Sequence, residues 1–373
     1  MLETAIVLPH REQFSVGYAG AIALTVAGQL ADAPADASLE AWGDPLQAAP
    51  LVVSKIFRPL RPAWWWLGRQ SHRYLRAIVQ SARLHQPHRL EVHNRAHLLL
   101  PLIRLGFPVA LYLHNDPQLI RGLKTRAERR AIVELADYVV CVSDYVRGRL
   151  CVELPEAACS RVFVVPNTVD VVQLTAKSPK NAEIIFVGRM VAEKGVHILV
   201  EALGRVLPNF PQWRARLIGA RYFGQKGLHH TYERQLQQQV KSDPVLASQV
   251  QFEGYQRYAE VIAAFNSAAI AVVPSLWDEP FGRTALEGMA GGCAVIASNR
   301  GGLPEVVGDA GILVEPTVDA LARELTSLMS YPDYCAEIGA RCAERAHTVF
   351  EPSVIHQKIN ALRRTPSMWI VPG

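Results

Sequence analysis

The sequence has no long apolar segment and no leader-like start. Its 373 residues contain no run of about 18 or more uncharged apolar residues, so we expect no transmembrane helix. The N-terminus lacks a basic region followed by an apolar stretch and a cleavage site, and residues 1–8 instead predict a first strand. These absences favour a cytoplasmic protein without a signal peptide.

Cysteine is scarce, and its spacing excludes the common metal motifs. The six cysteines form no Cys-x-x-Cys pair, and no histidine spacing matches a zinc site. Cys141 and Cys293 fall in strand-like apolar runs and are expected to be small core residues. This usage fits a reducing compartment, and we expect no bound metal and no cofactor.

Acidic residues are absent from residues 45–90. The same stretch contains Trp64–Trp66, with Phe57 and Tyr74 nearby, and eight basic residues: Lys55, Arg58, Arg61, Arg69, Arg73, Arg76, Arg83 and Arg89. Basic side chains interleaved with tryptophan favour contact with an anionic membrane surface. A solvated basic helix with inward-facing tryptophans and a nucleic-acid surface are the alternatives, but no nucleic-acid motif accompanies the stretch.

Short apolar runs rich in Val and Ile alternate with helical patterns in two successive series. The first series runs from 5–8 through 90–93, 109–114 and 138–142 to 162–165, and the second runs from 183–188 through 215–219, 250–253, 270–273 and 294–297 to 311–314. This alternation predicts an α/β protein with two doubly wound, Rossmann-like domains facing a cleft. We expect domains at 1–172 and 180–351, and a helix and tail at 352–373 that cross back to the first domain.

Two carboxylates flank a glycine turn in the segment from Glu279 to Glu287. Pro280-Phe281-Gly282 suits a helix start, where free backbone N–H groups attract anions. Glu279, before that helix, and Glu287, about two turns inside it, are then placed to bind neutral hydroxyls of a phosphorylated ligand. An ordinary helix with one solvated and one packed glutamate is the alternative.

Two cations follow the strand predicted at 183–187. Gly188 turns the chain away, and Arg189 and Lys194 come next. An arginine fork and a mobile lysine amine suit a diphosphate leaving group, whose developing charge needs stabilisation. A solvated loop with a Glu193–Lys194 pair is the alternative.

The first domain offers two weaker signals at strand ends. Gly17 and Gly20 precede the helix predicted at 21–30 and permit close approach to phosphate, although a plain turn explains them equally. His114 follows the strand that starts at Val109 and is placed to bind a hydroxyl or accept a proton, with a capped loop as the alternative. No Asp-x-Asp follows a strand, so we expect metal-independent chemistry.

Taken together, these motifs resemble the retaining glycosyltransferases of family 4, also called group 1, which have the GT-B fold. The resemblance rests on Gly188-Arg189 with Glu193-Lys194-Gly195, on Glu279-Pro-Phe-Gly282 with Glu287, and on Gly301-Gly302-Leu303-Pro304-Glu305. It also rests on Val165–Asp170, where Thr168 stands in place of the usual glycine. The similarity is specific over 162–316 and looser before it, where Tyr18-Ala19 replaces adjacent glycines.

The resemblance implies a role for each matching residue. In the second domain, the donor diphosphate would lie on Arg189 and Lys194, the donor sugar on Glu279 and on backbone N–H groups near Phe281 and Gly282, and the ribose on Glu287. In the first domain, Gly17 would let a loop close over the phosphates, and His114 would lie near the transferred sugar. We expect the loop containing Tyr255, after the strand at 250–253, to meet the base.

The resemblance also implies an activity. It predicts transfer of a sugar from a nucleotide donor, such as a UDP-sugar or GDP-mannose, to a hydroxyl, with retention and without a protein nucleophile. A lipid-linked glycan or a lipopolysaccharide or exopolysaccharide intermediate at the inner membrane face would suit the basic first domain as acceptor. A sugar-nucleotide epimerase of the same fold and a non-catalytic sugar-nucleotide-binding scaffold are the alternatives. The sequence identifies neither base, sugar, acceptor nor oligomeric state.

Overall fold

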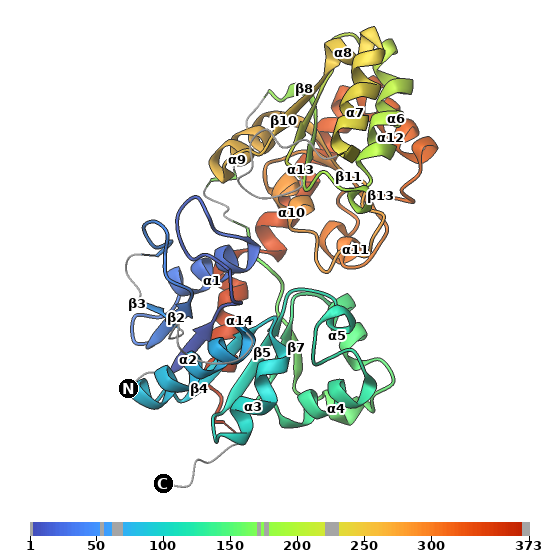
Figure 1. The fold of residues 1–373 in the computed structure, drawn as a ribbon. Helices are drawn as coiled ribbons and strands as arrows, with labels where there is room; N and C mark the ends of the chain where they lie inside the picture. Colours follow the sequence, from blue (N-terminus) through green and yellow to red (C-terminus); the bar gives the residue numbers. More distant parts are fainter. Residues whose placement is uncertain are drawn as a thin grey trace. The chain divides into compact units, whose positions relative to one another are not determined.

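The chain consists of two compact units, each built on one parallel sheet. The computed structural model describes residues 3–52, 56–61, 70–169, 173–174, 179–220 and 231–367. The first unit combines Met1–Thr168 with Pro352–Gly373, and the second is Val169–Glu351. Helices cover the faces of both sheets (Figure 1). The expected α/β class, with two doubly wound sheets, is confirmed.

The first sheet has seven strands in the order β3-β2-β1-β4-β5-β6-β7, all parallel. Its strands are β1 (Thr4–Val7), β2 (Leu39–Gly43), β3 (Ile56–Pro59), β4 (Arg89–His93), β5 (Val109–Leu113), β6 (Val139–Cys141) and β7 (Val162–Val164). The α-helices of this unit are α1 (Ala21–Ala31), α2 (Gln70–His85), α3 (Leu99–Arg104), α4 (Arg126–Leu135), α5 (Asp144–Cys151) and α14 (Pro352–Arg364). Short 3₁₀ turns are η1 (Ala96–Leu98), η2 (Pro117–Leu119) and η3 (Glu156–Cys159).

The second sheet has six parallel strands in the order β10-β9-β8-β11-β12-β13. They are β8 (Asn181–Val187), β9 (Arg214–Ile218), β10 (Val250–Gly254), β11 (Ala268–Val273), β12 (Ala294–Ser298) and β13 (Ile312–Val314). The helices are α6 (Val196–Val206), α7 (Thr231–Ser242), α8 (Pro244–Gln249), α9 (Tyr258–Ser267), α10 (Arg283–Ala290), α11 (Leu303–Val307), α12 (Val318–Ser330) and α13 (Pro332–Val349), with 3₁₀ turns η4 (Ala192–Lys194) and η5 (Leu207–Asn209).

Both sheets are wound in the same way. Counted within its own unit, each begins with the order 3-2-1-4-5-6, so the winding direction reverses between the first and fourth strands. The reversal lies between β1 and β4 in the first unit and between β8 and β11 in the second. In open parallel sheets, ligands bind beyond the carboxyl ends of the strands at this switch point. The fold therefore marks one candidate binding region in each unit.

The sequence analysis missed the two edge-side strands of the first sheet, β2 and β3. Each carries a charge: Glu40 in β2 accepts two 2.8 Å hydrogen bonds from Arg58 in β3, one from Nε and one from Nη2. The Trp42 indole donates to the same carboxylate at 2.8 Å. Compensated charges of this kind look like loop residues in a sequence, because the compensation comes from the neighbouring strand.

These contacts change the interpretation of the basic stretch at 45–90. Arg58 is held by Glu40, and the buried Arg89 forms an ion pair with Asp137 at 2.8 Å. Tyr74, which the sequence places near the tryptophans, is 2% exposed and donates its hydroxyl to the Leu8 carbonyl. Part of the stretch is therefore structural. Trp64–Trp66, Lys55 and Arg69 lie outside the described residues.

Cys151 and Cys159 form a disulfide, which the sequence analysis did not anticipate. They end α5 and η3, and their Cα atoms are 6.3 Å apart, within disulfide reach. The other four cysteines are free and buried. The expectation of a reducing compartment rested on unpaired cysteines and loses that support. Within the described ranges, no helix is long and apolar enough to cross a membrane.

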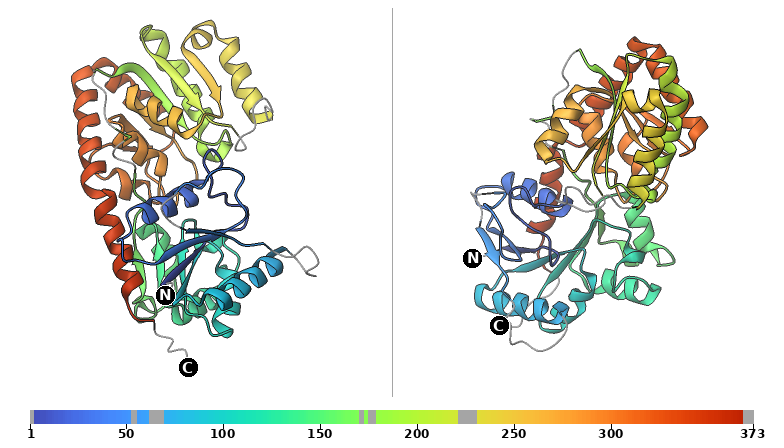
Figure 2. Two further views of the ribbon diagram at one scale, coloured as in Figure 1. Left: turned by 90° about the vertical axis from the view of Figure 1, so that its left-hand side faces the viewer. Right: turned by 45° about the horizontal axis from the view of Figure 1, so that its top comes forward.

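The last helix, α14, belongs to the first unit although the second unit precedes it in the chain (Figure 2). Its Arg363 donates to both oxygens of Glu91 in β4, from Nη2 at 2.7 Å and from Nε at 3.0 Å. Glu91 is fully buried. His356, about two turns earlier on α14, contacts Asp32, which follows α1, at 2.7 Å. Side chains of α14 thus complete the core of a sheet formed some 270 residues earlier.

Arg363→Gln should strongly destabilise the first unit. The substitution leaves the buried Glu91 carboxylate without its cation, which typically costs about 3–5 kcal/mol. Arg364→Gln is the matched control, because Arg364 is exposed and its contact with Asp36 at 3.3 Å is a surface pair worth less than about 1 kcal/mol. Urea unfolding measures both. Equal losses in the two variants would contradict a structural role for the Arg363–Glu91 pair.

Candidate functional site

A close backbone approach brings the loop after β8 to the loop after β11. Gly195 has a φ of +68°, and a Cβ on it would lie 1.8 Å from the Pro274 carbonyl oxygen. Only glycine fits there, and the Leu276 N–H donates to the Glu193 carbonyl at 2.8 Å to join the loops. Lys194, between Glu193 and Gly195, is therefore held at the switch point of the second sheet.

At that switch point, two of the expected site residues meet. The Lys194 Nζ lies 2.5 Å from Oε1 of Glu279, which also accepts from the Ser275 hydroxyl at 2.5 Å. The amine lies 5.3 Å from the centre of the Trp277 ring. Glu279 is 7% exposed, whereas Lys194 is half-buried. The site is thus a carboxylate that accepts hydrogen bonds from two donors. One of these donors, the Lys194 ammonium group, also lies over an aromatic ring.

The double glycine at 301–302 explains how the Glu279 backbone is held. A Cβ on Gly301, whose φ is +57°, would lie 2.3 Å from the Glu279 carbonyl oxygen. The N–H of Gly302 donates to the same oxygen at 2.7 Å. The glycines therefore act through packing, since they let the turn before α11 lie directly on the loop that carries Glu279.

Gly282 is the N-cap of α10 and has a φ of +102°, which favours glycine. The helix begins at Arg283, so Glu287 lies about one turn inside it rather than two. Phe281 is buried and packs edge-on against Phe350, with ring centres 5.8 Å apart. The Phe281 side chain therefore packs in the core, and its backbone leads into the start of α10.

Glu287 belongs to a second polar cluster. Its Oε1 accepts from Nε of Arg283 at 2.8 Å and from the Tyr258 hydroxyl at 3.3 Å. Burial, followed by the Glu287 charge, raises the pKa of Tyr258 to about 12, so Tyr258 remains a hydrogen-bond donor. The sequence analysis missed Tyr258, Arg283 and Ser275. Only the four-residue spacing of Arg283 and Glu287 on one helix could have suggested this cluster.

The remaining second-unit candidates are more open. Arg189 is exposed, and its side chain forms no ion pair within the described part of the chain. It follows Gly188, whose carbonyl oxygen would lie 1.9 Å from a Cβ on Gly219. Tyr255 is half-buried in the loop after β10. Arg189 is therefore an accessible cation on the same loop as Lys194.

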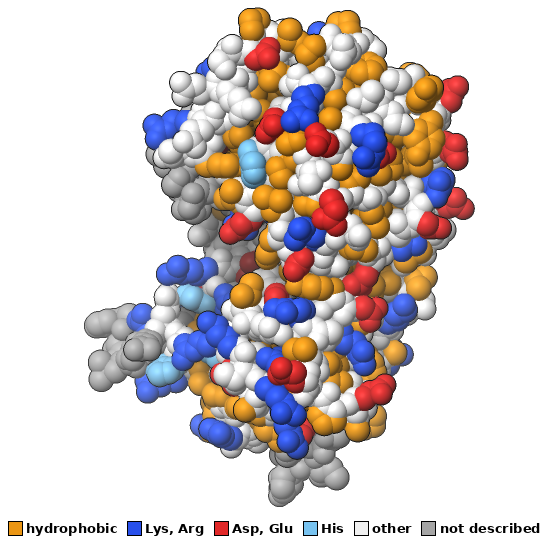
Figure 3. Space-filling model, turned by 90° about the vertical axis from the view of Figure 1, so that its right-hand side faces the viewer, with side chains coloured by type: hydrophobic (Ala, Val, Ile, Leu, Met, Phe, Trp, Pro, Cys, Tyr) orange, Lys and Arg blue, Asp and Glu red, His pale blue; other side chains and the backbone are white. Residues whose placement is uncertain are grey.

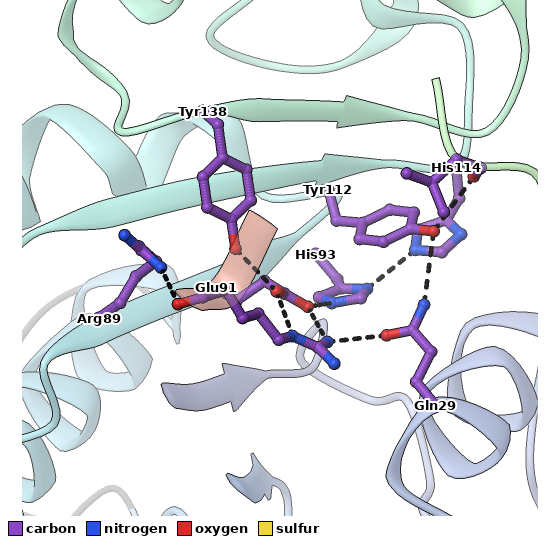
Figure 4. Close-up of polar contacts among 9 residues, drawn as sticks. Gln29, Arg89, Glu91, His93, Tyr112, His114 and Tyr138 are labelled. Atoms are coloured by element: carbon purple, nitrogen blue, oxygen red, sulfur yellow. Dashed lines mark hydrogen bonds and ion pairs between the residues drawn. The ribbon is translucent and has the colours of Figure 1, made fainter. Parts of the chain in front are cut away.

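In the first unit, His114 ends a buried chain of polar side chains (Figure 4). Its Nε2 lies 2.8 Å from Nδ1 of His93, and Nε2 of His93 lies 3.0 Å from Oε1 of Glu91. Both rings stack on Tyr112, with ring centres 4.7 and 4.8 Å away. The backbone N–H of His114 donates to the Asn94 side chain at 2.8 Å. His114 is thus held by residues of β4, the strand beside its own.

The protonation of this chain follows from its buried end. Burial raises the pKa of Glu91, but Arg363 and the His93 hydrogen bond outweigh burial and hold that pKa well below its ordinary value. Burial lowers the pKa of His93 more than Glu91 raises it. The ionised Glu91 therefore accepts from Nε2–H of a neutral His93, whose Nδ1 must accept from Nε2–H of His114. In a neutral His114, Nδ1 is then the basic nitrogen.

The glycine turn of the first unit is open at Gly17 and is followed by a capped helix. Gly17 has a φ of +82°, but nothing lies within 4 Å of a Cβ placed on it. The start of α1 is already occupied by Glu12, whose Oε1 accepts from the Ala23 N–H at 3.1 Å. A carboxylate thus stands where a phosphate was expected to approach the helix. His114 and Gly17 both belong to the first unit.

The described residues contain no group of three or more His, Cys, Asp or Glu side chains arranged to hold a metal ion. The clusters above are instead built from carboxylates paired with lysine, arginine, tyrosine or histidine. They are suited to hold phosphate with cations and hydroxyl groups with carboxylates.

Two protein-family models match adjoining parts of the chain. The model described as "Glycosyl transferases group 1" matches residues 172–346, and "Glycosyltransferase Family 4" matches residues 23–173. Together the two matches run from residue 23 to residue 346 and include every residue of the second-unit clusters.

Curated relatives match over part of their length. Spore coat protein SA of Bacillus subtilis is 26% identical over 228 residues, which are 56% of this chain and 59% of that protein. Glycogen synthase of Mycobacterium tuberculosis is 32% identical over 203 residues, which are 52% of this chain and 46% of that protein. The match therefore spans about half the length of these relatives.

Solved structures share the fold over nearly the whole chain. Sucrose-phosphate synthase from Thermosynechococcus elongatus superposes with a TM-score of 0.77 at 20% identity, covering 97% of this chain and 98% of that one. HepE from Anabaena, in complex with UDP and glucose, gives a TM-score of 0.75 at 21% identity, covering 96% and 98%. At these identities the likeness concerns the fold, which is that of GT-B glycosyltransferases.

Replacing His93 should reduce the loss of stability in acid. The pKa of His93 is lowered in the folded protein. Below the ordinary value of 6.5, the unfolded chain therefore takes up a proton that the folded chain does not. The free energy of unfolding consequently decreases as the pH is lowered. In His93→Phe, which keeps an aromatic ring against Tyr112, the loss between pH 7.5 and 5.5 should be smaller by about 1 kcal/mol.

Urea unfolding at the two pH values measures this difference, with His72→Phe as control because His72 is exposed on α2. An unchanged pH dependence in His93→Phe would mean that His93 is protonated in the folded protein, and the deduced tautomer of His114 would then be wrong.

Proposed function

We propose that this chain, which belongs to the group 1 glycosyltransferases with the GT-B fold, moves a sugar from a nucleotide-sugar donor to a hydroxyl acceptor with retention at the anomeric carbon. The observation that carries the proposal is the Lys194–Glu279 pair at the switch point of the second sheet, with the exposed Arg189 on the same loop. A cation for phosphate and a carboxylate for sugar hydroxyls lie side by side there.

The donor diphosphate would be shared between Arg189 and Lys194. Without ligand, Lys194 is partly neutralised by Glu279, so an arriving phosphate competes with that carboxylate for the amine. Ser275 keeps a second hydrogen bond to Glu279 when the amine turns to phosphate. Glu279 then accepts from hydroxyl groups of the donor sugar, assisted by backbone N–H groups near Phe281 and Gly282. The two cations stabilise the charge that develops as the diphosphate leaves.

The nucleoside would lie on the second cluster. One oxygen of Glu287 is used by Arg283 and Tyr258, which leaves the other oxygen to accept from ribose hydroxyls. Tyr255, in the loop after β10, would meet the base. UDP is the first donor nucleotide to test, because HepE, which shares the fold, was solved with UDP. GDP-mannose remains the second candidate.

We propose a front-face reaction in which the leaving phosphate draws the acceptor proton, with no protein nucleophile and no metal. His114, with Nδ1 as its basic nitrogen, would accept a hydrogen bond from a hydroxyl of the transferred sugar. A same-fold epimerase would need no acceptor, and turnover of a UDP-sugar without acceptor to an epimer would favour it. Nucleotide binding without any turnover would favour a scaffold.

A lipid-linked glycan or a lipopolysaccharide or exopolysaccharide intermediate is the acceptor class we propose, with the protein on the inner face of the cytoplasmic membrane. Among the described residues of the 45–90 stretch, Arg61, Arg76 and Arg83 are exposed and suit an anionic surface. Arg58 and Arg89 do not, because each is held by a buried carboxylate. A vesicle-binding test of this proposal should therefore reverse the charge at Arg61, Arg76 and Arg83.

Arg189→Ala should lower turnover by about 10²–10³ without destabilising the fold. The side chain is exposed and unpaired among the described residues, so its loss affects the leaving group alone, as removal of one oxyanion donor does. Arg323→Ala, an exposed arginine of α12, is the control. A thermal-shift screen of UDP-, GDP- and ADP-sugars identifies the donor. The turnover of that donor is then measured for the wild type and for both variants. Equal turnover in both variants would refute the diphosphate role.

Glu279→Gln and Glu287→Ala should affect different steps. Glu279→Gln weakens contacts with the sugar, so it should lower turnover, while the bare nucleoside diphosphate should bind at least as tightly as to the wild type because its phosphate no longer competes with a carboxylate for Lys194. Glu287→Ala removes the ribose contact, so calorimetry should show weaker binding of the bare nucleotide. A loss of hydrogen bonds to a charged group is worth about 1.5–3 kcal/mol in each case. The opposite pattern would exchange the two roles.

A further inference from the structure

A basic cavity lies in the first unit, at the switch point of its sheet. It has a volume of about 350 Å³ and is lined by the first turns of α2 and by three loops that carry its basic residues: His10 and Arg11 after β1, Arg95 and His97 after β4, and Arg121 after β5. The loops after β1 and β4 flank the place where the winding of the sheet reverses. This is the position at which open parallel sheets bind ligands.

The arginines around this cavity have no acidic partner. Within the described ranges, Arg11, Arg95 and Arg121 form no ion pair, and the side chains of Arg11 and Arg95 contact only neutral acceptors, Gln70 Oε1 at 3.5 Å and the Asn94 carbonyl at 3.4 Å. This contrasts with Arg58 and Arg89 of the same unit, each of which is paired with a carboxylate.

Two carboxylates act on this lining, and each also accepts a backbone N–H. Asp44 binds His10 Nδ1 at 2.9 Å and the Arg11 backbone N–H at 2.6 Å. Glu12, whose charge acts on Arg95, caps α1 through the Ala23 N–H. On the outside of the first unit, Lys, Arg and His side chains gather on one side with little acid among them (Figure 3). The cavity therefore combines three guanidinium groups with acceptors that do not neutralise them.

His97 lies among the same lining residues. Burial, and then the charges of Arg121 and Arg95, lower the pKa of His97 to about 4. Burial is the larger cause, and the two guanidinium groups add to it because a further positive charge near them would be repelled. An anion between these groups would remove the repulsion, so the geometry favours a negatively charged occupant.

A glycine contact holds the third arginine in place. Gly122 has a φ of +92°, and a Cβ on it would lie 2.9 Å from the His97 backbone nitrogen. The loop after β5 can therefore press against η1 only with glycine at this position. This packing holds the backbone of Arg121, the preceding residue, beside η1, while the Arg121 side chain itself is exposed.

We propose that this cavity binds a phosphate group carried by the acceptor. Guanidinium groups present paired N–H donors that match phosphate oxygens, and three of them converge here. A volume near 350 Å³ is at the lower end of small-molecule sites, which suits one phosphate and the sugar that bears it. That the bound molecule is the acceptor rests on the proposed transferase function, whereas anion binding by the cavity does not.

The cavity is connected to His114 through one residue. Asn94, with a φ of +52°, precedes Arg95 and accepts the backbone N–H of His114 with its side chain. A phosphate on Arg95 would therefore be held by the same loop that positions His114. This arrangement fixes an acceptor by its charge and leaves its hydroxyl groups for the reaction.

The test compares two double variants with equal loss of charge. Arg95→Gln/Arg121→Gln removes two cavity arginines, whereas Arg104→Gln/Arg126→Gln removes two exposed arginines of α3 and α4 outside the cavity. Calorimetry with glucose 1-phosphate and with inorganic phosphate should show at least about tenfold weaker binding per arginine in the cavity variant and wild-type affinity in the control. Glucose itself should not distinguish the proteins.

A second arm identifies the source of the phosphate. Flotation with vesicles containing phosphatidic acid, against neutral phosphatidylcholine vesicles, is measured for the same proteins. Binding to soluble sugar phosphate assigns a free phosphorylated acceptor, and binding only to phosphatidic acid assigns a lipid-borne phosphate; either supports the proposal if the cavity variant alone loses it. Equal behaviour of the two double variants in both arms overturns it.

Calorimetry with UDP separates this result from a failure of the proposed function. UDP is expected on the second unit, so both double variants should bind it like the wild type, which also shows that they are folded. If no protein binds a nucleotide but the phosphate difference persists, the transferase proposal fails while the cavity assignment stands.

Discussion

The buried charge of Glu91 is the constraint on which the first unit depends. A carboxylate removed from water inside a sheet is tolerated only when it is paired and hydrogen-bonded. Arg363, 272 residues later, His93 and Tyr138 together supply that compensation. The need to satisfy one carboxylate thus docks the C-terminal helix on the first unit. Burial keeps His93 neutral, so its hydrogen bond to Glu91 selects the hydrogen-bonded form of His114. The same hydrogen bonds therefore link the stability of the first unit to the orientation of His114.

The two sheets are wound in the same way, but the charged residues at their switch points differ. In the second unit, the cation at the switch point is Lys194, and Glu279 lies 2.5 Å from it. In the first unit, Arg95 and Arg121 line a cavity with His97, and within the described residues neither arginine forms an ion pair. A site that contains its own counterion can exchange it for part of a ligand, whereas a site without one gains more from an anionic ligand. This difference suits a donor held by both charge and hydroxyl contacts and an acceptor anchored by charge.

Much of the fold and part of the candidate site could be predicted from the sequence. The strands beginning near Ala5, Val109 and Glu183 are continuous apolar runs, and that signal is local. The helix over 352–364 followed from its spacing and matches α14. The motif residues at Glu279 and Lys194 were also identifiable, because glycine turns and charged residues at strand ends are visible in a few consecutive letters. Their direct contact was not, since 85 residues separate them.

By itself, the sequence determined the class of fold, the order of the strand-helix units and the loops that carry charge, because apolar periodicity and turn residues act over short distances. Only the tertiary structure decided which charges are neutralised. Arg58 and Glu40 became partners through strand pairing, and Arg363 and Glu91 through helix docking. Cys151 and Cys159, eight residues apart, were joined by the turn between α5 and η3. The same holds for the cavity around Arg95, His97 and Arg121. Coulombic interactions and hydrogen bonds depend on distances of a few ångströms, which the linear order of residues does not contain.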